Sequence, residues 1–213
     1  MNKDLEDSIK KITHDIRDIR YVDETRIPDI GLYMDQVIAF LDDHLSDSRR
    51  NDEDKIMTKT MINNYAKGGL IPAPEKKKYT AEHVMILILL YYYKNFLSIS
   101  DIEKLLGPVI KGHYQKPDAD IKFSDVFREI FASLDDSRPM LDGSVDQALE
   151  MASKVFNEAP EEDRDRLQLL LFTSILGQDI FAKLMIMQRL IDKLDDGSGK
   201  EVKEKEKKEK KDK

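Results

Sequence analysis

The chain has 213 residues, of which 40% are hydrophobic and 36% charged, and its formal net charge is −7. This apolar fraction can supply a real core, which excludes a wholly disordered protein, and the scarcity of glycine and absence of tryptophan favour helices over sheets. Cysteine is absent, which excludes disulfides, thiolate metal sites and cysteine nucleophiles.

The first 20 residues predict an amphipathic helix. Its apolar side chains alternate in steps of four and three, which places them on one narrow seam: Leu5, Ile9, Ile12, Ile16 and Ile19. Two partners are open for this seam. The short length favours docking on the same chain, and the alternative is a second chain in a coiled coil.

The sequence also bears on the compartment. The N-terminus lacks the continuous apolar stretch of a signal peptide. The longest apolar run, residues 84–93, is well short of the ~20 residues that a bilayer requires. We therefore expect a cytoplasmic protein that does not associate with a membrane.

A second helix is predicted over 29–45, opened by Pro28. One buried stripe with the spacing i, i+3, i+4, i+7 runs along it: Ile30, Tyr33, Met34, Val37, Ile38, Leu41 and Leu45. A polar loop is expected at 46–55.

A third helix is predicted over 58–67, with Thr58 as its N-cap. It ends at KGGLIP, where Gly68 or Gly69 can adopt the left-handed conformation and Pro72 prevents continuation. If Ile62 and Tyr65 face the core, the opposite face carries Lys59, Thr60, Asn63, Asn64 and Lys67.

Further helices follow the turn APEKKK. One begins after the N-cap candidate Thr80 and is apolar nearly all round, so it should be covered on more than one side. The next begins at Ser98 and ends before a loop at 107–120. Helices are then expected near 120–135, 144–157 and 161–194.

The last of these helices carries a long apolar stripe: Leu176, Ile180, Leu184, Met187, Ile191 and Leu194. Bundle core and dimer interface both stay open for this face. The charged tail, residues 196–213, has no apolar face and should be disordered or a frayed helix.

No sequence motif indicates catalysis. The four histidines, His14, His44, His83 and His113, are far apart and are expected at surface or boundary positions. There is no HExxH, GxSxG, GxGxxG, phosphate loop or calcium loop. We expect no enzyme activity, no metal site and no cofactor.

The segment 61–72, MINNYAKGGLIP, resembles the second helix and exit of MerR-type helix-turn-helix regulators, whose pattern runs T-I-R-Y-Y-E-x-x-G-L-L-P. Over 27–106, the motifs LYMDQV, TKTMINNY and YTxEH resemble more closely the YkrK-like family of bacterial proteins of unknown function. The residues that match the MerR pattern directly are Tyr65, Gly69, Leu70, Pro72 and Tyr79. Asn63 stands where MerR-type proteins usually carry arginine, and Asn64 replaces the first tyrosine.

The resemblance implies an all-α fold in which a MerR-like winged helix-turn-helix domain precedes a C-terminal helical bundle. The divisions are an N-terminal helix (1–27), the MerR-like domain (28–107), the C-terminal helical region (118–195) and a disordered charged tail (196–213). The 29–45 helix would be the first helix, 58–67 the recognition helix and the turn at 72–79 the wing.

The resulting expectation is a sequence-specific DNA-binding protein that regulates transcription. Asparagine can pair bidentately with adenine, and lysine neutralises phosphate. The candidate residues are Lys59, Thr60, Asn63, Asn64, Lys67, Lys76, Lys77 and Lys78. The expected partners are double-stranded DNA and a second copy, bound through the N-terminal or C-terminal helices.

An alternative function stays open. The net charge of −7 and the missing arginine are typical of a degenerate helix-turn-helix that no longer binds DNA. The chain would then be a non-catalytic protein-interaction module.

Overall fold

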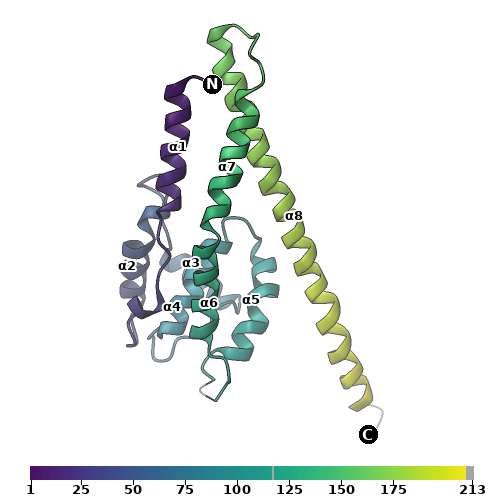
Figure 1. Cartoon of the computed structure of the whole chain (residues 1–213). Helices are drawn as coiled ribbons and strands as arrows, with labels where there is room; N and C mark the ends of the chain where they lie inside the picture. Colours follow the sequence, from purple (N-terminus) through teal and green to yellow (C-terminus); the bar gives the residue numbers. More distant parts are fainter. Residues whose placement is uncertain (117, 210–213) are drawn as a thin grey trace.

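Helices make up the regular structure of the chain (Figure 1). The computed structural model describes the backbone of residues 1–116 and 118–209 and the side chains of 1–116 and 118–194. Within this described part there are α-helices, two short 3₁₀ helices and two isolated β-bridges, but no strand. The predicted all-α class is confirmed.

The α-helices are α1 (Lys3–Arg17), α2 (Met34–Leu45), α3 (Lys59–Lys67), α4 (Ala81–Tyr93), α5 (Ile99–His113), α6 (Phe123–Asp136), α7 (Arg138–Ser153) and α8 (Glu161–Glu209). The 3₁₀ helices are η1 (Glu24–Arg26) and η2 (Ser46–Ser48).

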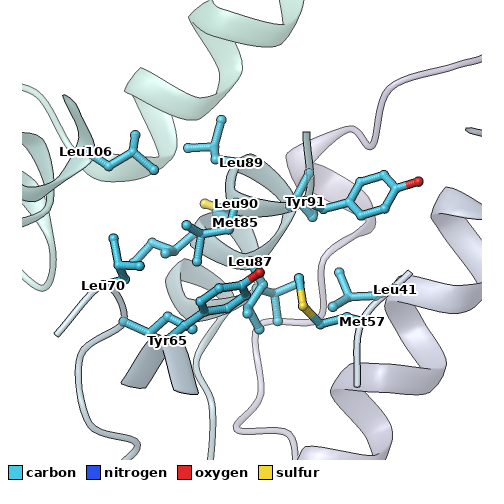
Figure 2. Close-up of a cluster of buried hydrophobic side chains, with 14 of the residues drawn as sticks. Leu41, Met57, Tyr65, Leu70, Met85, Leu87, Leu89, Leu90, Tyr91 and Leu106 are labelled. Carbon is cyan, nitrogen blue, oxygen red and sulfur yellow. The ribbon is translucent and has the colours of Figure 1, made fainter. Parts of the chain in front are cut away.

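Helix α4 lies at the centre of the larger hydrophobic core. Every residue from 83 to 91 is buried, as the apolar composition of this helix predicted. Figure 2 shows Leu41 of α2, Tyr65 of α3 and Leu106 of α5 gathered around Met85 and Leu87 of α4. The core therefore fixes the position of α3 from its inner face.

Helix α6 completes this core with aromatic side chains. Phe123 and Phe127 are fully buried, and the Phe131 ring lies 5.7 Å from that of Tyr92 and 5.3 Å from that of Tyr21. The larger core thus extends from Val22 to α6, with Ile191 of α8 added to it.

A smaller hydrophobic cluster joins α1, α7 and α8: Ile9, Val145, Ala148, Leu149, Ala152 and Phe172. The two alanines let the helices approach closely. The α1 seam is only partly covered, because Ile12 and Ile16 are 57% and 53% exposed.

Helix α8 contributes to both clusters. Phe172 packs in the smaller cluster and Ile191 in the larger one. Between them, Ile180 and Phe181 are 65% and 56% exposed. Figure 1 shows the lower part of α8 diverging from α7.

Membrane-span criteria of length and composition are met within the described residues by one helix, over Glu161–Leu194 of α8. One such helix is weak evidence for a membrane protein. The same stretch includes an ion pair between Asp179 and Lys183, at 2.7 Å. The expected absence of membrane association stays a prediction.

The start of the second helix was predicted too early. Helix α2 begins at Met34, because the backbone of Leu32 is paired with Tyr79 through N–H···O bonds of 2.9 and 2.8 Å. Ile30 and Tyr33, predicted to be buried, are 67% and 54% exposed. Leu32 is buried in their place.

The loop predicted at 107–120 was also wrong over its first half. Helix α5 continues through Gly107 and Pro108 to His113. Ile110 extends the buried stripe of Ile102 and Leu106, so tertiary burial outweighs the cost of proline in a helix.

The C-terminal helices begin and end differently from the prediction. Helix α7 starts at Arg138 with Pro139 in its first turn, where a missing backbone N–H costs nothing. Helix α8 starts at Glu161 as expected and continues to Glu209, well into the predicted charged tail. Residues 210–213 of that tail lie outside the described part.

Candidate nucleic-acid interface

Helix α3 forms for local reasons that the sequence makes visible. The Thr58 hydroxyl accepts the backbone N–H of Met61 at 3.2 Å, which confirms Thr58 as the N-cap. At the other end, Gly69 has φ = +77°, the left-handed conformation expected for Gly68 or Gly69 of KGGLIP. Ile62 and Tyr65 are buried and fix the rotation of the helix about its axis.

All five predicted α3 residues are exposed: Lys59, Thr60, Asn63, Asn64 and Lys67. At 3.6 residues per turn they occupy an arc of about 140°. The expectation that they lie opposite Ile62 and Tyr65 is confirmed. This arc, hereafter the α3 face, carries two amides, two ammoniums and a hydroxyl, and it carries no carboxylate.

The first turn of α3 has an unusual charge. It contains no acidic residue, and Lys59 occupies its first position. A cation at a helix N-terminus is disfavoured by the helix dipole. Lys59 is partly compensated by Asp35 of α2, at 2.6 Å, but both side chains are more than half exposed, so this pair contributes little stability.

The predicted turn after α3 is very tight. Lys76 and Lys77 have φ values of +49° and +64°, and the backbone N–H of Lys78 donates to the Glu75 carbonyl at 2.9 Å. Two consecutive positive φ values are typical of a type I′ turn, which usually contains Asn or Gly. The turn projects two exposed lysines at its tip.

Lys78 has a different environment from its two neighbours. Its ammonium lies 5.6 Å from the centre of the Tyr33 ring. Its aliphatic chain crosses Gly31, where an added Cβ would stand 3.0 Å from the Cβ of Lys78. Gly31 therefore leaves room for the turn to pack on the segment before α2.

The N-terminus of α2 links the α3 face to this turn. Tyr33, the N-cap of α2, contacts Lys78, and Asp35 in the first turn of α2 pairs with Lys59. Lysines from the start of α3 and from the turn therefore flank the same short stretch at the start of α2. From the sequence, the proximity of the α3 lysines to the turn lysines was predicted only through the resemblance to a winged helix-turn-helix.

His83 holds the turn in place from inside the core. Its Nδ1 accepts the backbone N–H of Thr80 at 3.0 Å, so the proton is on Nε2, which donates to the Pro72 carbonyl at 3.1 Å. The Tyr114 hydroxyl lies 3.2 Å from Nδ1. Burial lowers the pKa of His83, and the bond to Pro72 opposes this shift only in part.

The surface or boundary position expected for the histidines was wrong for His83, which is 1% exposed. Its local signal was present: Thr80 and His83 have the spacing of a capping box, in which the residue at the third helical position reaches back to the N-cap. Histidine replaces the usual Glu or Gln there, and this concealed the motif.

One feature departs from a helix-turn-helix. Such motifs join their two helices by a turn of about 3–4 residues. Here residues 46–58 separate α2 from α3, and they include η2 and the buried residues Ile56 and Met57. The described turn at 75–78 contains one isolated bridge and no extended strand, so a winged helix-turn-helix is not established by these elements.

Residues 22–130 match a family described as a domain of unknown function, DUF1836. The match covers slightly more than half of the chain. The chain belongs to the DUF1836 family. No curated protein and no solved structure matches it. The match gives no link to the YkrK-like family or to MerR-type regulators, and both resemblances stay predictions.

The DUF1836 segment supplies most of the larger hydrophobic core, to which Ile191 of α8 also contributes. That core begins at Val22, and its last α6 residue, Phe131, lies one position beyond the match. The segment includes His83 and all eight candidate residues, whereas α1, α7 and α8 lie outside it. All candidate interface residues therefore lie within the DUF1836 segment.

Proposed function

We propose that the chain binds double-stranded DNA in a sequence-specific manner and regulates transcription, with α3 as a MerR-like recognition helix. The observation that carries this proposal is the α3 face. In a chain of net charge −7, this exposed helical arc of about 140° contains two lysines and no carboxylate of its own.

The dimensions and chemistry of α3 fit a major groove. Nine residues give a length of about 13 Å, and the B-DNA major groove is about 12 Å wide. Asn63 and Asn64 are the candidates for adenine, since an amide can donate to N7 and accept from the N6 amino group as a bidentate pair. Lys59 and Lys67, at opposite ends of the helix, are the candidates for phosphate.

The charge at the start of α3 supports an anionic partner. Helices α1, α2, α4, α5, α6 and α8 have acidic residues in their first turns, whereas α3 and α7 have none and begin with Lys59 and Arg138. Backbone N–H groups at a helix N-terminus favour phosphate. Lys59 lowers the stability of the free protein, because its charge opposes the helix dipole. A bound backbone phosphate would offset this unfavourable interaction.

The turn supplies the second phosphate contact in this proposal. Lys76 and Lys77 are exposed at its tip, while His83 fixes its two ends. A rigid turn places charge on flanking DNA with little loss of conformational entropy. Lys78 contributes mainly by packing on Gly31 and Tyr33.

A second copy of the chain would place two recognition helices on one operator, about 34 Å apart or a multiple of that distance. The exposed apolar side chains of α8, among them Ile180 and Phe181, support dimerisation through this helix. Ile12 and Ile16 of α1 offer the same possibility at the N-terminus.

A non-catalytic interaction module is the second candidate. The long connection between α2 and α3 and the exposed apolar face of α8 favour it. In that case the α3 face would be a solvated surface, and a partner protein would cover α8.

Selection of bound fragments from a genomic DNA library at two salt concentrations separates these functions. The proposal predicts recovery of a few sequences at both salt concentrations, with weaker retention at high salt. Recovery without sequence preference would indicate non-specific binding only. No recovery at low salt, together with co-purification of a protein after nuclease treatment, would favour the interaction module.

A further inference from the structure

A cavity outside the α3 face is lined by an unusual number of guanidinium groups. Its volume is about 710 Å³, and it lies between the end of α1, residues 18–26, α6 and the start of α7. Five arginines line it: Arg17, Arg20, Arg26, Arg128 and Arg138. The two aromatic residues in its wall are Tyr21 and Phe131.

Three of the arginines build the walls. Arg138 donates to the carbonyls of Arg17 and Ile19, pairs with Asp135 at 2.7 Å, and covers the Tyr21 ring at 4.9 Å. These bonds fix the segment that follows α1.

Arg17 and Arg128 likewise connect separate elements of the cavity wall. Arg17 pairs with Asp142 of α7 at 3.2 Å, and Arg128 of α6 pairs with Glu24 of η1 at 3.1 Å. Ion pairs therefore join separate elements of the cavity wall, α1 to α7 and α6 to η1.

The carboxylates of the lining already have partners. Asp18 pairs with Arg17, Glu24 with Arg128, and Asp135 with Arg138. Asp23 accepts hydrogen bonds from the hydroxyl and the backbone N–H of Thr25, which are the main reason that its pKa is lowered.

Arg20 and Arg26 differ from the other three arginines. Both are exposed, and neither forms an ion pair within the part of the chain that the structure describes. Arg26 acts on the Asp23 carboxylate only as a minor cause of its lowered pKa. Two guanidiniums at the mouth of a preformed polar cavity therefore keep their donors available.

We propose that this cavity binds a small molecule with a diphosphate group, held by Arg20 and Arg26. The guanidinium fork matches phosphate oxygens bidentately, and two arginines on adjacent segments suit two linked phosphates. The volume lies within the range of about 300–1,000 Å³ that is typical of small-molecule sites.

The position of the cavity gives binding a structural consequence. Its lining joins Val22 and Phe131 of the larger core to Arg17 and Arg138, which anchor α1 and α7 of the smaller cluster. A diphosphate bound by Arg20 and Arg26 would therefore lie at the junction of the two parts. This inference does not depend on DNA binding, and its test contains no DNA.

The test is isothermal titration of the full chain with inorganic pyrophosphate and, separately, with ADP at physiological salt. The matched variants are Arg20→Gln/Arg26→Gln, and Arg50→Gln/Arg166→Gln as a control with two exposed arginines outside the cavity. Both pairs lose the same charge. Circular dichroism verifies that each variant is folded.

We expect saturable binding by the native chain and by the control, and a loss of roughly tenfold or more in affinity in Arg20→Gln/Arg26→Gln. Tighter binding of ADP than of pyrophosphate would assign the site to a nucleotide, and equal binding to the diphosphate group alone; both support the proposal. Absence of binding, or equal weakening in the two variants, would overturn it.

Discussion

The DUF1836 segment and the helices outside it expose surfaces of different polarity. In the segment, α4 is apolar and wholly enclosed, and the exposed α3 face is polar and basic. Outside it, α8 is also apolar, but Ile180 and Phe181 remain exposed. The two apolar helices of this chain thus differ in burial. Apolar composition predicts that a helix will be buried, but it does not identify the element or second chain that buries it.

Matched phenylalanine truncations test this difference with the largest expected effect. Phe127→Ala removes a fully buried ring and should lower the free energy of unfolding by about 3–5 kcal/mol. Phe181→Ala removes a ring that is 56% exposed and should cost less than about 1 kcal/mol in a dilute monomer. Urea unfolding measures both. Equal losses would mean that α8 is covered in solution.

A charge on α8 sharpens the comparison further. If a second copy covers this helix, Ile180→Asp should weaken dimerisation by roughly tenfold or more, because a carboxylate would be buried in the interface. Sedimentation equilibrium measures the effect. Ile30→Asp, at an equally exposed isoleucine within the DUF1836 segment, is the control and should leave the mass unchanged.

Lipid vesicles test whether a membrane, and not a second copy of the chain, covers the apolar face of α8. Native protein that floats with neutral vesicles, and that stays monomeric without them, would assign the apolar face to a membrane and contradict dimerisation through α8.

Substitutions in the turn at 75–78 test the polar surface, with an expected effect of intermediate size. Lys76→Asn/Lys77→Asn removes two charges and keeps residues that tolerate positive φ. The slope of log affinity for DNA against log salt should fall by about 0.9 for each phosphate that the turn no longer neutralises, for all sequences alike. Lys10→Asn/Lys11→Asn on α1 is the control. An unchanged slope in the turn variant would remove the turn from the interface.

The smallest effect concerns His83. Its pKa in the folded chain is lowered, so the unfolded chain binds the proton more readily. The stability contributed by neutral His83 is fully present above about pH 6.5 and is lost as the pH falls below that value. Unfolding curves between pH 8 and pH 5 should show this loss in the native chain, and the pH dependence should be smaller in His83→Gln. An identical pH dependence in both would contradict the role given to His83.

Local signals were sufficient for much of the fold. The N-cap Thr58, the left-handed Gly69 and the enclosed α4 follow from hydrogen-bond and burial rules that operate within a few residues. The start of α2 and the continuation of α5 through Pro108 did not, because pairing with Tyr79 and burial of Ile110 are tertiary effects.

In the candidate site too, some features could be predicted from the local sequence and others could not. Helical periodicity alone placed Asn63 and Asn64 opposite Ile62, since rotation about a helix axis is fixed by a few buried residues. It could not show that Asp35 pairs with Lys59 or that Lys78 packs on Gly31, because these contacts join segments far apart in the sequence. His83 was missed because histidine replaces the usual Glu or Gln of the capping box with Thr80, and because its other partners, Pro72 and Tyr114, lie farther along the chain.

The most direct test of the central proposal is the affinity of Asn63→Ala/Asn64→Ala for a genomic DNA fragment that the native chain selects, compared with a scrambled fragment. Alanine is the better helix former and both side chains are exposed, so folding should be retained. We predict that binding to the selected fragment weakens by about 1–3 kcal/mol for each base that the asparagines read, with almost no change on the scrambled one. Unchanged affinity and preference in the double variant would contradict base recognition by the α3 face.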